Sequence, residues 1–435
     1  MSGYTVPYGH DHLTFHLPDE LHTELISPAQ AASASDPIRA VNDALDASLG
    51  GKRRADFAGA QSAVVAVNDK TRPVPHKYLL QPLLARLEAM DISRDSITIL
   101  VAVGTHPPMR SSEFADIIPP EVLQRYRVLS HDPDDRGNLV YLGQTQRGTP
   151  VWINRRFAQA DLRIVVGNIE PHQFQGFSGG YKTAAIGLAG RDTVNRNHAM
   201  MTDPNAAPCR FEDNPPRQDI EEIGRLISVH LALNAVVNES KQIVAVLAGD
   251  PAEVMSRGIP LARKIYQVQV AGAFDLIIAS PGGHPKDINL YQAQKALAHA
   301  SLVMKEGGTV VLVAACPEGT GSASYERWME SMTPDSGWGK DWIVNRAAYE
   351  AVIERFRREG FCAGPHKAYL IARDASRVRT LMLSEMPLDF VRRLLLNPVA
   401  SLDEGISLAL GDLPPGARVG VMPAANSTIP VMRET

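Results

Sequence analysis

The stretch from residue 170 to residue 200, EPHQFQGFSGGYKTAAIGLAGRDTVNRNHAM, gathers several residue types that can do chemistry. A glycine pair before a lysine suits phosphate binding, but the spacing is not the GxxxxGK[ST] of a P-loop. Lys182 has apolar neighbours, so it could instead have a lowered pKa and act as a nucleophile. His172 and His198 flank it, and histidine is the commoner choice for metal binding and proton transfer. A phosphate loop, a metal site and a covalent-catalysis site are all open here.

Two more polar segments follow β-rich runs. VNDKTRP (67–73) offers cations, small acceptors and backbone N–H groups to a phosphate, ribose or carboxylate, with Arg72 able to bind in a forked manner. An ordinary polar turn explains this segment equally well. In VGTHPP, His106 follows a strand and can serve as an acid or base, although a lone histidine there is more often structural. His172 repeats the arrangement, which favours the role for both, and Glu170 could orient His172 or form an ion pair elsewhere.

A third segment, NLYQAQKAL, is expected to begin a helix. Tyr291, Gln292 and Lys295 would share one helix face at i, i+3 and i, i+4 spacing, which suits recognition of a carboxylate or phosphate. An exposed first turn is the competing interpretation. No HExxH motif, cysteine cluster or carboxylate cluster accompanies the histidines, so a hydrolytic zinc site is poorly supported. A metal that needs one protein nitrogen remains compatible, if a cofactor supplies its other ligands.

Short β-branched runs alternate with helical periodicity along the chain, which predicts an α/β fold with mainly parallel sheets. The first series of predicted elements consists of strands at 62–69, 96–106, 161–172 and 241–250 and a helix at 76–90. A second series consists of strands beginning at 274 and 308, a helix at 291–307, and later strands at 366–373 and 417–425. The restart places a domain boundary near residue 270, giving domains 1–270 and 271–435. Ligands bind beyond the carboxyl ends of such strands, so the polar clusters there should converge.

Composition restricts the class of protein. A chain of 435 residues is too long for one ordinary core, and no apolar run could span a bilayer. The net charge of -4 argues against a nucleic-acid partner. Three distant cysteines form no CxxC pair, and the N-terminus lacks a secretion-signal pattern, so we expect a cytoplasmic, two-domain protein. The histidine-rich start (His10, His12, His16) is interpreted as a solvated arm rather than a metal site.

Five motifs in order carry a resemblance to a known family. VNDKTRP, VGTH, EPHQFQGFSGGYK, NH and GGHPKDINLYQAQK resemble segments of the nickel-pincer nucleotide-dependent lactate racemases and their 2-hydroxyacid racemase and epimerase relatives. The likeness covers most of the chain and fades beyond about residue 325. It implies two α/β domains with the active site in the cleft between them. The N-terminal domain would carry cofactor and catalysis, and the C-terminal domain would contribute substrate-binding residues.

The resemblance also implies residue roles. Lys182 would attach the cofactor, a Ni(II)-pyridinium-3,5-bisthiocarboxylate mononucleotide, through a thioamide, and His198 would be the single protein ligand of nickel, completing a square-planar set. The full implied site is: catalytic His106 and His172; cofactor-binding Asp69, Lys70, Thr71, Arg72, Lys182 and His198; substrate-binding Arg72, Tyr291, Gln292 and Lys295.

The implied reaction inverts a 2-hydroxy acid by moving hydride. Removing the Cα proton is difficult because a carboxylate stabilises the resulting carbanion poorly, whereas removing hydride gives a bound 2-keto acid. A base takes the hydroxyl proton, and hydride returned to the opposite face gives the other enantiomer. Each enantiomer needs its own base, and the two strand-end histidines would supply them. Other proteins must build the cofactor, and a homo-oligomer is possible.

The sequence leaves open which side chain the 2-hydroxy acid carries. Tyr181 stands where lactate-specific relatives often carry arginine. Trp338 and Trp342 are candidates for a tryptophan of the lactate site, and His366 or Lys367 could line the pocket instead. Two rival functions are a Lys182-based Schiff-base lyase or epimerase without nickel, and a non-catalytic carrier of the nickel nucleotide.

Overall fold

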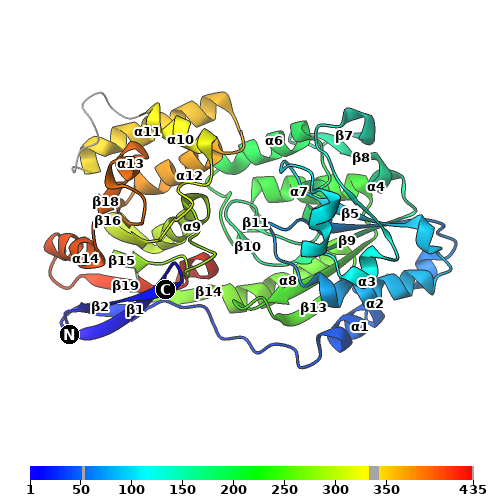
Figure 1. Cartoon of the computed structure of the whole chain (residues 1–435), viewed down its shortest axis with the longest axis horizontal. Helices are drawn as coiled ribbons and strands as arrows, with labels where there is room; N and C mark the ends of the chain where they lie inside the picture. Colours follow the sequence, from blue (N-terminus) through cyan, green and yellow to red (C-terminus); the bar gives the residue numbers. More distant parts are fainter. Residues whose placement is uncertain (51–53, 333–341, 434–435) are drawn as a thin grey trace. The chain divides into compact units, whose positions relative to one another are not determined.

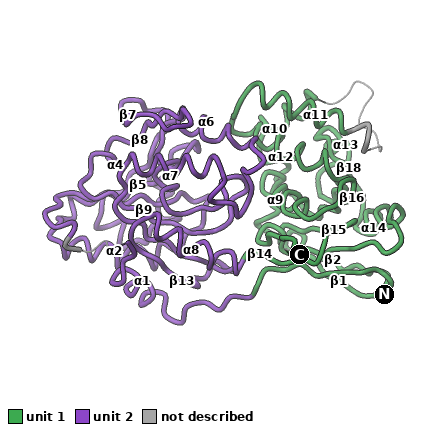
Figure 2. Tube along the Cα trace, turned by 180° about the vertical axis from the view of Figure 1, so that it is seen from behind, with its two compact units in different colours: residues 1–29, 266–435 green, residues 30–265 purple. Residues whose placement is uncertain are grey.

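The structure is a computed structural model that describes residues 1–50, 54–332 and 342–433. The chain divides into two compact units, coloured separately in Figure 2. Unit 1 combines Met1–Ala29 with Tyr266–Thr435, and unit 2 is Gln30–Ile265. Each unit holds its own mainly parallel sheet, so the predicted α/β class with two domains is confirmed.

Unit 2 is built on a six-stranded sheet in the order β13-β12-β9-β4-β5-β6. Its neighbouring strands are parallel except β12 and β13. The strands are β4 (Ala63–Asn68), β5 (Ile97–Ala102), β6 (Arg127–Ser130), β9 (Leu162–Asn168), β12 (Leu231–Val237) and β13 (Ile243–Gly249). Every residue of β4 and β5 is buried, as expected for parallel strands covered on both faces. The four predicted strands of this region are confirmed, each inside its predicted range.

The order of these strands reverses at β4. The chain proceeds from β4 to β5 and β6 on one side and then places β9 on the other. The short helix α5 (Lys182–Ala185) contacts both β4 and β9, and α7 (Pro215–Ile227), which is labelled in Figure 1, packs against α5. Ligands in open α/β sheets bind beyond the carboxyl ends of the strands at such a reversal. The fold therefore directs attention to the loops that follow β4, β5 and β9.

The remaining helices and small ribbons of unit 2 complete this frame. They are α1 (Pro37–Asp46), α2 (His76–Glu88), α3 (Pro120–Leu123), α4 (Arg155–Gln159), α6 (Arg191–Ala199) and α8 (Pro251–Tyr266), with strand pairs β7 (Leu139–Gln144)–β8 (Pro150–Asn154) and β10 (Pro171–His172)–β11 (Gly176–Phe177). The side chains of Asp36 and Asn214 cap α1 and α7, and proline at the first helical position favours each start. Within the described ranges, no helix is long and apolar enough to cross a membrane.

Unit 1 has a second six-stranded sheet, in the order β18-β17-β16-β15-β19-β3, with all pairs parallel. Its strands are β3 (His22–Leu25), β15 (Phe274–Ala279), β16 (Met304–Val313), β17 (Arg379–Leu383), β18 (Asn397–Val399) and β19 (Arg418–Met422). Its helices are α9 (Leu290–Ala300), α10 (Ala323–Glu330), α11 (Trp342–Glu359), α12 (Pro365–Ala375), α13 (Leu388–Arg393) and α14 (Leu402–Gly411), and β14 (Gln267–Val270) pairs with β20 (Ile429–Met432).

One predicted strand of unit 1 is wrong. Residues 366–373 lie inside the helix α12, which begins with proline after Gly364. Every residue of α12 except Arg373 is buried. A helix buried on all sides lacks the polar face that reveals helical periodicity, so its sequence resembles a buried strand.

The N-terminal residues belong to unit 1, whereas the sequence groups them with the first domain. Strands β1 (Ser2–Tyr8) and β2 (Asp11–Leu17) form a hairpin, and β3 pairs with β19 at the edge of the sheet. The backbone N–H of Gly9 donates to Asp287 (2.8 Å). The junction at Tyr266 lies close to the boundary expected near residue 270. The histidines of the expected solvated arm are exposed, but they belong to an ordered hairpin. β3 pairs with β19, about 400 residues later in the chain, so no local sequence pattern reveals this pairing.

Ile26 and Leu25 provide a matched test of this arrangement. Ile26 is fully buried in the unit 1 core, whereas Leu25 is 59% exposed. We expect Ile26→Ala to lower the free energy of unfolding by about 2–5 kcal/mol because it removes buried methyl groups and leaves a cavity. Leu25→Ala should change it by less than about 0.5 kcal/mol. Denaturant unfolding of the two variants measures both values, and equal effects would contradict the placement of β3.

Candidate active site

The loops after β4, β5 and β9 are tied to one another at the carboxyl edge of the unit 2 sheet. The Asn168 side chain, at the end of β9, donates to the carbonyl of Pro73 in the loop after β4 (2.8 Å). Thr183 of α5 donates to the side chain of Asn68 at the end of β4 (3.2 Å). The backbone N–H of Gly104, just after β5, donates to Gly187 (2.9 Å). The predicted convergence of the strand-end clusters is therefore confirmed.

His106 is oriented by a carboxylate. Its Nδ1 lies 2.7 Å from Asp69 Oδ2, while the Thr71 hydroxyl and backbone N–H bind Oδ1 of Asp69 (2.6 and 3.1 Å). Burial raises the pKa of Asp69, but the hydrogen bonds from His106 and Thr71 outweigh it and hold that pKa below its usual range. With the carboxylate accepting from Nδ1–H, the lone pair of neutral His106 stands on Nε2. The pair can therefore take a proton at Nε2 and stabilise the resulting imidazolium.

Lys182 lies directly after a glycine turn that is held from two sides. Gly179 and Gly180 both have positive φ (86° and 57°), and a Cβ on Gly180 would lie 2.5 Å from Met255. The N–H of Gly180 donates to Asn234 (2.7 Å), and Arg217 donates to the carbonyl of Phe177 (2.9 Å). This turn fixes where α5 begins and hence the position of the Lys182 side chain.

The amine of Lys182 is buried, and its pKa is lowered strongly. The residue is only 7% exposed, and no hydrogen-bond partner for its Nζ is found within the described part of the chain. Burial lowers its pKa well below the usual value, and the charges of Arg72 and Arg217 lower it further. A neutral amine is the nucleophilic form of lysine, so this position suits covalent attachment.

His198 stands in the last turn of α6 as a neutral imidazole. Burial, followed by the charges of Lys182, Arg72 and His106, lowers its pKa to about 3. Neutral imidazole is the form that binds metals. Among the described residues, no group of three His, Cys, Asp or Glu side chains is arranged to hold a metal. His198 can therefore offer one nitrogen to a metal whose other ligands come from a bound group.

Phe174 lies between His172 and His198 and contacts both rings. The Phe174 ring contacts both His172 and His198 edge-on, at centroid distances of 4.9 and 5.1 Å. The backbone N–H of Gln175 donates to Nδ1 of His172 (3.2 Å), so neutral His172 carries its proton on Nε2. His172 and His106 thus present opposite hydrogen-bonding states at Nε2. Glu170, left open by the sequence, forms an ion pair with Lys241 (2.8 Å).

The other loop residues differ in their surroundings. Arg72 is exposed, and its charge acts on both Lys182 and His198, so it belongs to the same site. Lys70 instead forms a half-exposed ion pair with Glu113 (2.8 Å). Its predicted contact with a cofactor stays a prediction.

The predicted substrate residues lie in unit 1, at the start of α9. Lys295 donates to the side chain of Gln292 (2.7 Å). The Tyr291 hydroxyl lies 3.4 Å from His366 Nε2, and the ammonium of Lys367 lies over the Tyr291 ring (4.4 Å). The structure therefore brings His366 and Lys367 to Tyr291, and the substrate-binding role of this group stays a prediction. Trp338 lies outside the described residues, as does the side chain of Trp342.

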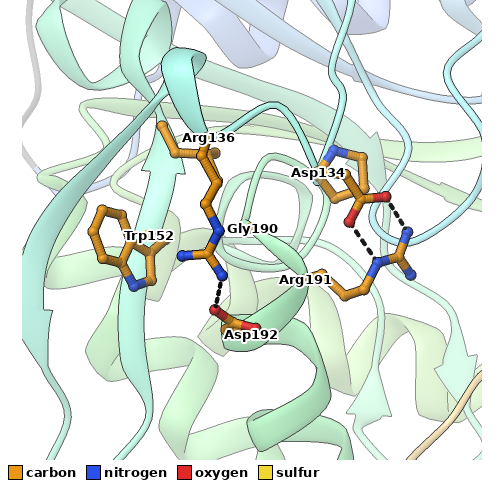
Figure 3. A pocket seen from close by; sticks show the side chains of 8 residues that line it. Asp134, Arg136, Trp152, Gly190, Arg191 and Asp192 are labelled. Atoms are coloured by element: carbon orange, nitrogen blue, oxygen red, sulfur yellow. Dashed lines mark hydrogen bonds and ion pairs between the residues drawn. The ribbon is translucent and has the colours of Figure 1, made fainter.

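A separate surface pocket lies at the beginning of α6, at the other end of the helix from His198. It is lined by Pro133, Asp134, Arg136, Leu139, Trp152, Gly190, Arg191 and Asp192. Figure 3 shows its charged side chains paired with each other, Arg191 with Asp134 and Arg136 with Asp192. The two ends of α6 are about 12 Å apart at 1.5 Å per residue, so this pocket is not part of the site.

Several supporting residues were missed by sequence reasoning. They are Gln175, Asn197, Arg217, Asp219 and Asn234, all fully buried polar side chains within hydrogen-bonding distance of site segments. Gln175 and Asn197 lie inside the motifs EPHQFQGFSGGYK and NH but have no role of their own there, and the other three lie outside every motif. Their roles appear only in the tertiary contacts.

An Asp–His pair, a second histidine and a buried lysine with a lowered pKa, at the reversal of an α/β sheet, are groups suited to acid/base chemistry. Comparison with known proteins identifies the class of enzyme. Residues 8–208 match the lactate racemase N-terminal domain, and residues 268–429 match the lactate racemase C-terminal domain. The chain belongs to the lactate racemase family and is an isomerase of the racemase type.

Individual relatives agree. The chain is 28% identical to lactate racemase from Thermoanaerobacterium thermosaccharolyticum, over 99% of both chains. It is 31% identical to lactate racemase from Lactiplantibacillus plantarum, over 75% of this chain and 77% of the relative. The structure of the Thermoanaerobacterium lactate racemase apoprotein matches with a TM-score of 0.88 at 26% identity, covering 100% of both chains. A Thermotoga maritima protein (TM-score 0.65, 16% identity, 93% of this chain and 100% of that one) shares the fold.

The lowered pKa of Lys182 can be tested in the protein without cofactor. An ordinary lysine, with a pKa near 10.4, is acylated about tenfold faster for each pH unit because its neutral fraction rises. Lys182 should show a shallower rise in its acylation rate from pH 7 to pH 9, because its lowered pKa leaves a larger neutral fraction at the start. Mass spectrometry of the Lys182 peptide measures this slope, and the same lysine in urea-unfolded protein is the control.

Arg72→Ala should raise the pKa of Lys182 and restore part of the slope, since it removes one of the charges that lowers the pKa. A native slope equal to the unfolded one would show that Lys182 is charged.

Proposed function

We propose that this chain racemises or epimerises a 2-hydroxy acid, lactate or a related 2-hydroxycarboxylate, by abstracting and returning hydride through a nickel-pincer nucleotide held covalently at Lys182. The observation that carries the proposal is the buried amine of Lys182, which has a lowered pKa and no hydrogen-bond partner among the described residues, near the neutral imidazole of His198. A family relationship to lactate racemases supports the reaction class.

The residues present fit the proposed cofactor. Thioamide formation needs a neutral amine, which burial provides at Lys182. Coordination to Ni(II) needs a neutral imidazole, which His198 provides. When bound, the pincer nucleotide supplies the site that takes up and releases hydride. Asp69, Lys70, Thr71 and Arg72 are the proposed contacts of its nucleotide portion.

The protein's own contribution is proton transfer and orientation. His106 takes the hydroxyl proton of one enantiomer at Nε2, and Asp69 stabilises the imidazolium that forms. His172 is the acid/base group for the hydroxyl of the other enantiomer. The guanidinium of Arg72 holds the substrate carboxylate in a forked manner.

Tyr291, Gln292 and Lys295 keep their predicted role in substrate binding as part of the proposal. Fixing the reactant in this way can lower the barrier by several kcal/mol, within the range of about 7–11 kcal/mol known for well-oriented intramolecular reactions. The proposal also includes action in the cytoplasm and maturation by the proteins that build the cofactor.

One rival function draws support from the same lysine. A neutral amine also suits Schiff-base formation with a carbonyl substrate, which gives a lyase or epimerase without nickel. The two chemistries treat the substrate differently, because hydride transfer keeps the Cα hydrogen whereas a Schiff-base enzyme exchanges it with solvent. A non-catalytic carrier is less favoured, since it would have no use for the Asp69–His106 pair.

Cofactor attachment is expected to require Lys182 and no other lysine. Protein co-expressed with the cofactor-building enzymes should carry a nickel-containing adduct of mononucleotide size, and Lys182→Ala should abolish it. Lys305→Ala, which removes a half-exposed lysine paired with Asp275 in unit 1, should keep the adduct. Intact mass and nickel content measure both. An unmodified, nickel-free chain from a host that loads a known relative would exclude the proposal.

The assignment of His106 and His172 as acid/base residues predicts that removing either one impairs racemisation but not cofactor attachment. His106→Ala and His172→Ala should keep the adduct and lower racemisation about 100-fold or more, because each removes an acid/base group. His16→Ala, an exposed histidine of the N-terminal hairpin, is the control. Chiral analysis of lactate and related 2-hydroxy acids gives the rates. Wild-type product formed in D₂O should retain the Cα hydrogen, and full activity in either histidine variant would refute its role.

A further inference from the structure

Which nitrogen of His198 can bind the proposed nickel depends on which of its two ring nitrogens carries the proton. Nδ1 of His198 lies 3.2 Å from Oδ1 of its neighbour Asn197. Asn197 is fully buried and lies in the same helix, α6. If Oδ1 accepts from Nδ1–H, the lone pair of the neutral ring is left on Nε2.

The orientation of the Asn197 amide is fixed by its other partners. Its Nδ2 donates to the carbonyl of Pro216 (2.8 Å) and to Asp219 Oδ2 (2.9 Å). Both partners are acceptors only, so the NH₂ group must face them and Oδ1 must face the other way. An amide oxygen cannot donate, and Nδ1 of His198 must therefore carry the hydrogen of that contact.

Asp219 anchors this arrangement. It is fully buried on α7, and its second oxygen accepts from the hydroxyl of Thr145 (2.6 Å). Gln175 donates to Oδ1 of Asn197 from the other side (2.9 Å), and its Nε2 lies at a longer 3.5 Å from Nδ1 of His198. Nδ1 cannot accept from Gln175 while it carries the hydrogen that Asn197 accepts, so this longer contact is not a hydrogen bond. Oδ1 thus accepts two hydrogen bonds, one from Gln175 and one from His198. The carbonyl of Val194, one turn earlier in α6, is a further hydrogen-bond acceptor for the His198 ring.

We propose that Asn197, held by Asp219, is a positioning residue that locks His198 in the Nδ1–H form and presents the Nε2 lone pair to nickel. The inference rests on the proposed function, in which His198 is the nickel ligand. A histidine ligand whose second nitrogen donates to an oxygen is held in one orientation and is a more basic ligand. Here an amide stands between the carboxylate and the imidazole, so the negative charge of Asp219 acts through the Asn197 dipole.

The consequence for metal retention can be measured on the loaded protein. Removing such a partner typically costs 10–100-fold in metal affinity. Asn197→Ala should therefore release nickel to a chelator at least about tenfold faster than wild type, while intact mass shows the organic adduct still attached. Asn195→Ala is the matched control, because it changes the same residue type in the same helix at a partly exposed position. Nickel release from Asn197→Ala at the wild-type rate would overturn the proposal.

Asp219→Asn covers the case in which Asn197→Ala does not fold. Its side-chain oxygen can still accept from Asn197, but the negative charge is gone. Nickel release between the wild-type rate and a tenfold increase is expected, and an unchanged rate would overturn the role of Asp219.

The tautomer itself can be read without any cofactor. In ¹⁵N-histidine-labelled apoprotein, long-range ¹H–¹⁵N spectra should show His198 protonated at Nδ1 and unprotonated at Nε2, with His198→Gln identifying its signals. Asn197→Ala should lose this single form. Protonation at Nε2 in the wild-type protein would overturn the inference even if nickel binds. A correct tautomer in a protein that never acquires nickel would instead refute the proposed function and leave the hydrogen-bond arrangement standing.

Discussion

Burial of the Lys182 amine is the constraint on which the rest of the site depends. An ammonium in that position would lose its hydration and lie near two guanidinium groups, so the neutral form is favoured. A buried donor without a partner costs about 1–3 kcal/mol. The fold accommodates that cost at the carboxyl edge of its sheet, where the same amine gains the reactivity that covalent chemistry needs. Stability and function therefore oppose each other at this residue.

The loop that carries Lys182 is supported by buried charge. Arg217 is fully buried, forms an ion pair with Glu221 (2.5 Å), and donates to the carbonyls of Phe177 and Gly179. A buried ion pair is weak evidence for stability, but it fixes geometry strongly because breaking it leaves an unpaired charge. Arg217 therefore has two effects on Lys182: it holds the glycine turn, and its positive charge lowers the pKa of the amine further.

The three histidines of the site differ through their hydrogen bonds rather than through their type. A carboxylate accepts from His106, a backbone N–H donates to His172, and a side-chain amide borders His198. Gln175 connects two of them, since its backbone binds Nδ1 of His172 and its side chain binds Asn197. In the proposed function, one residue type thereby supplies a base, a donor and a metal ligand. Relatives at 28–31% identity share the family.

The sequence by itself determined the α/β class, most of the parallel strands of unit 2, and the positions of His106 and His172 after strands. These follow from local periodicity and from polar residues at strand ends, which are short-range signals. The tertiary structure alone decided that Asp69 orients His106, that Asp219 lies behind Asn197, and that β3 joins the distant β19. It also showed α12 to be a helix. The sequence had not revealed this helix, because burial on all sides removes the amphipathic pattern by which a helix is recognised. Hydrogen bonds and strand pairs between residues far apart in the chain depend on how the elements pack, and no local pattern encodes that packing.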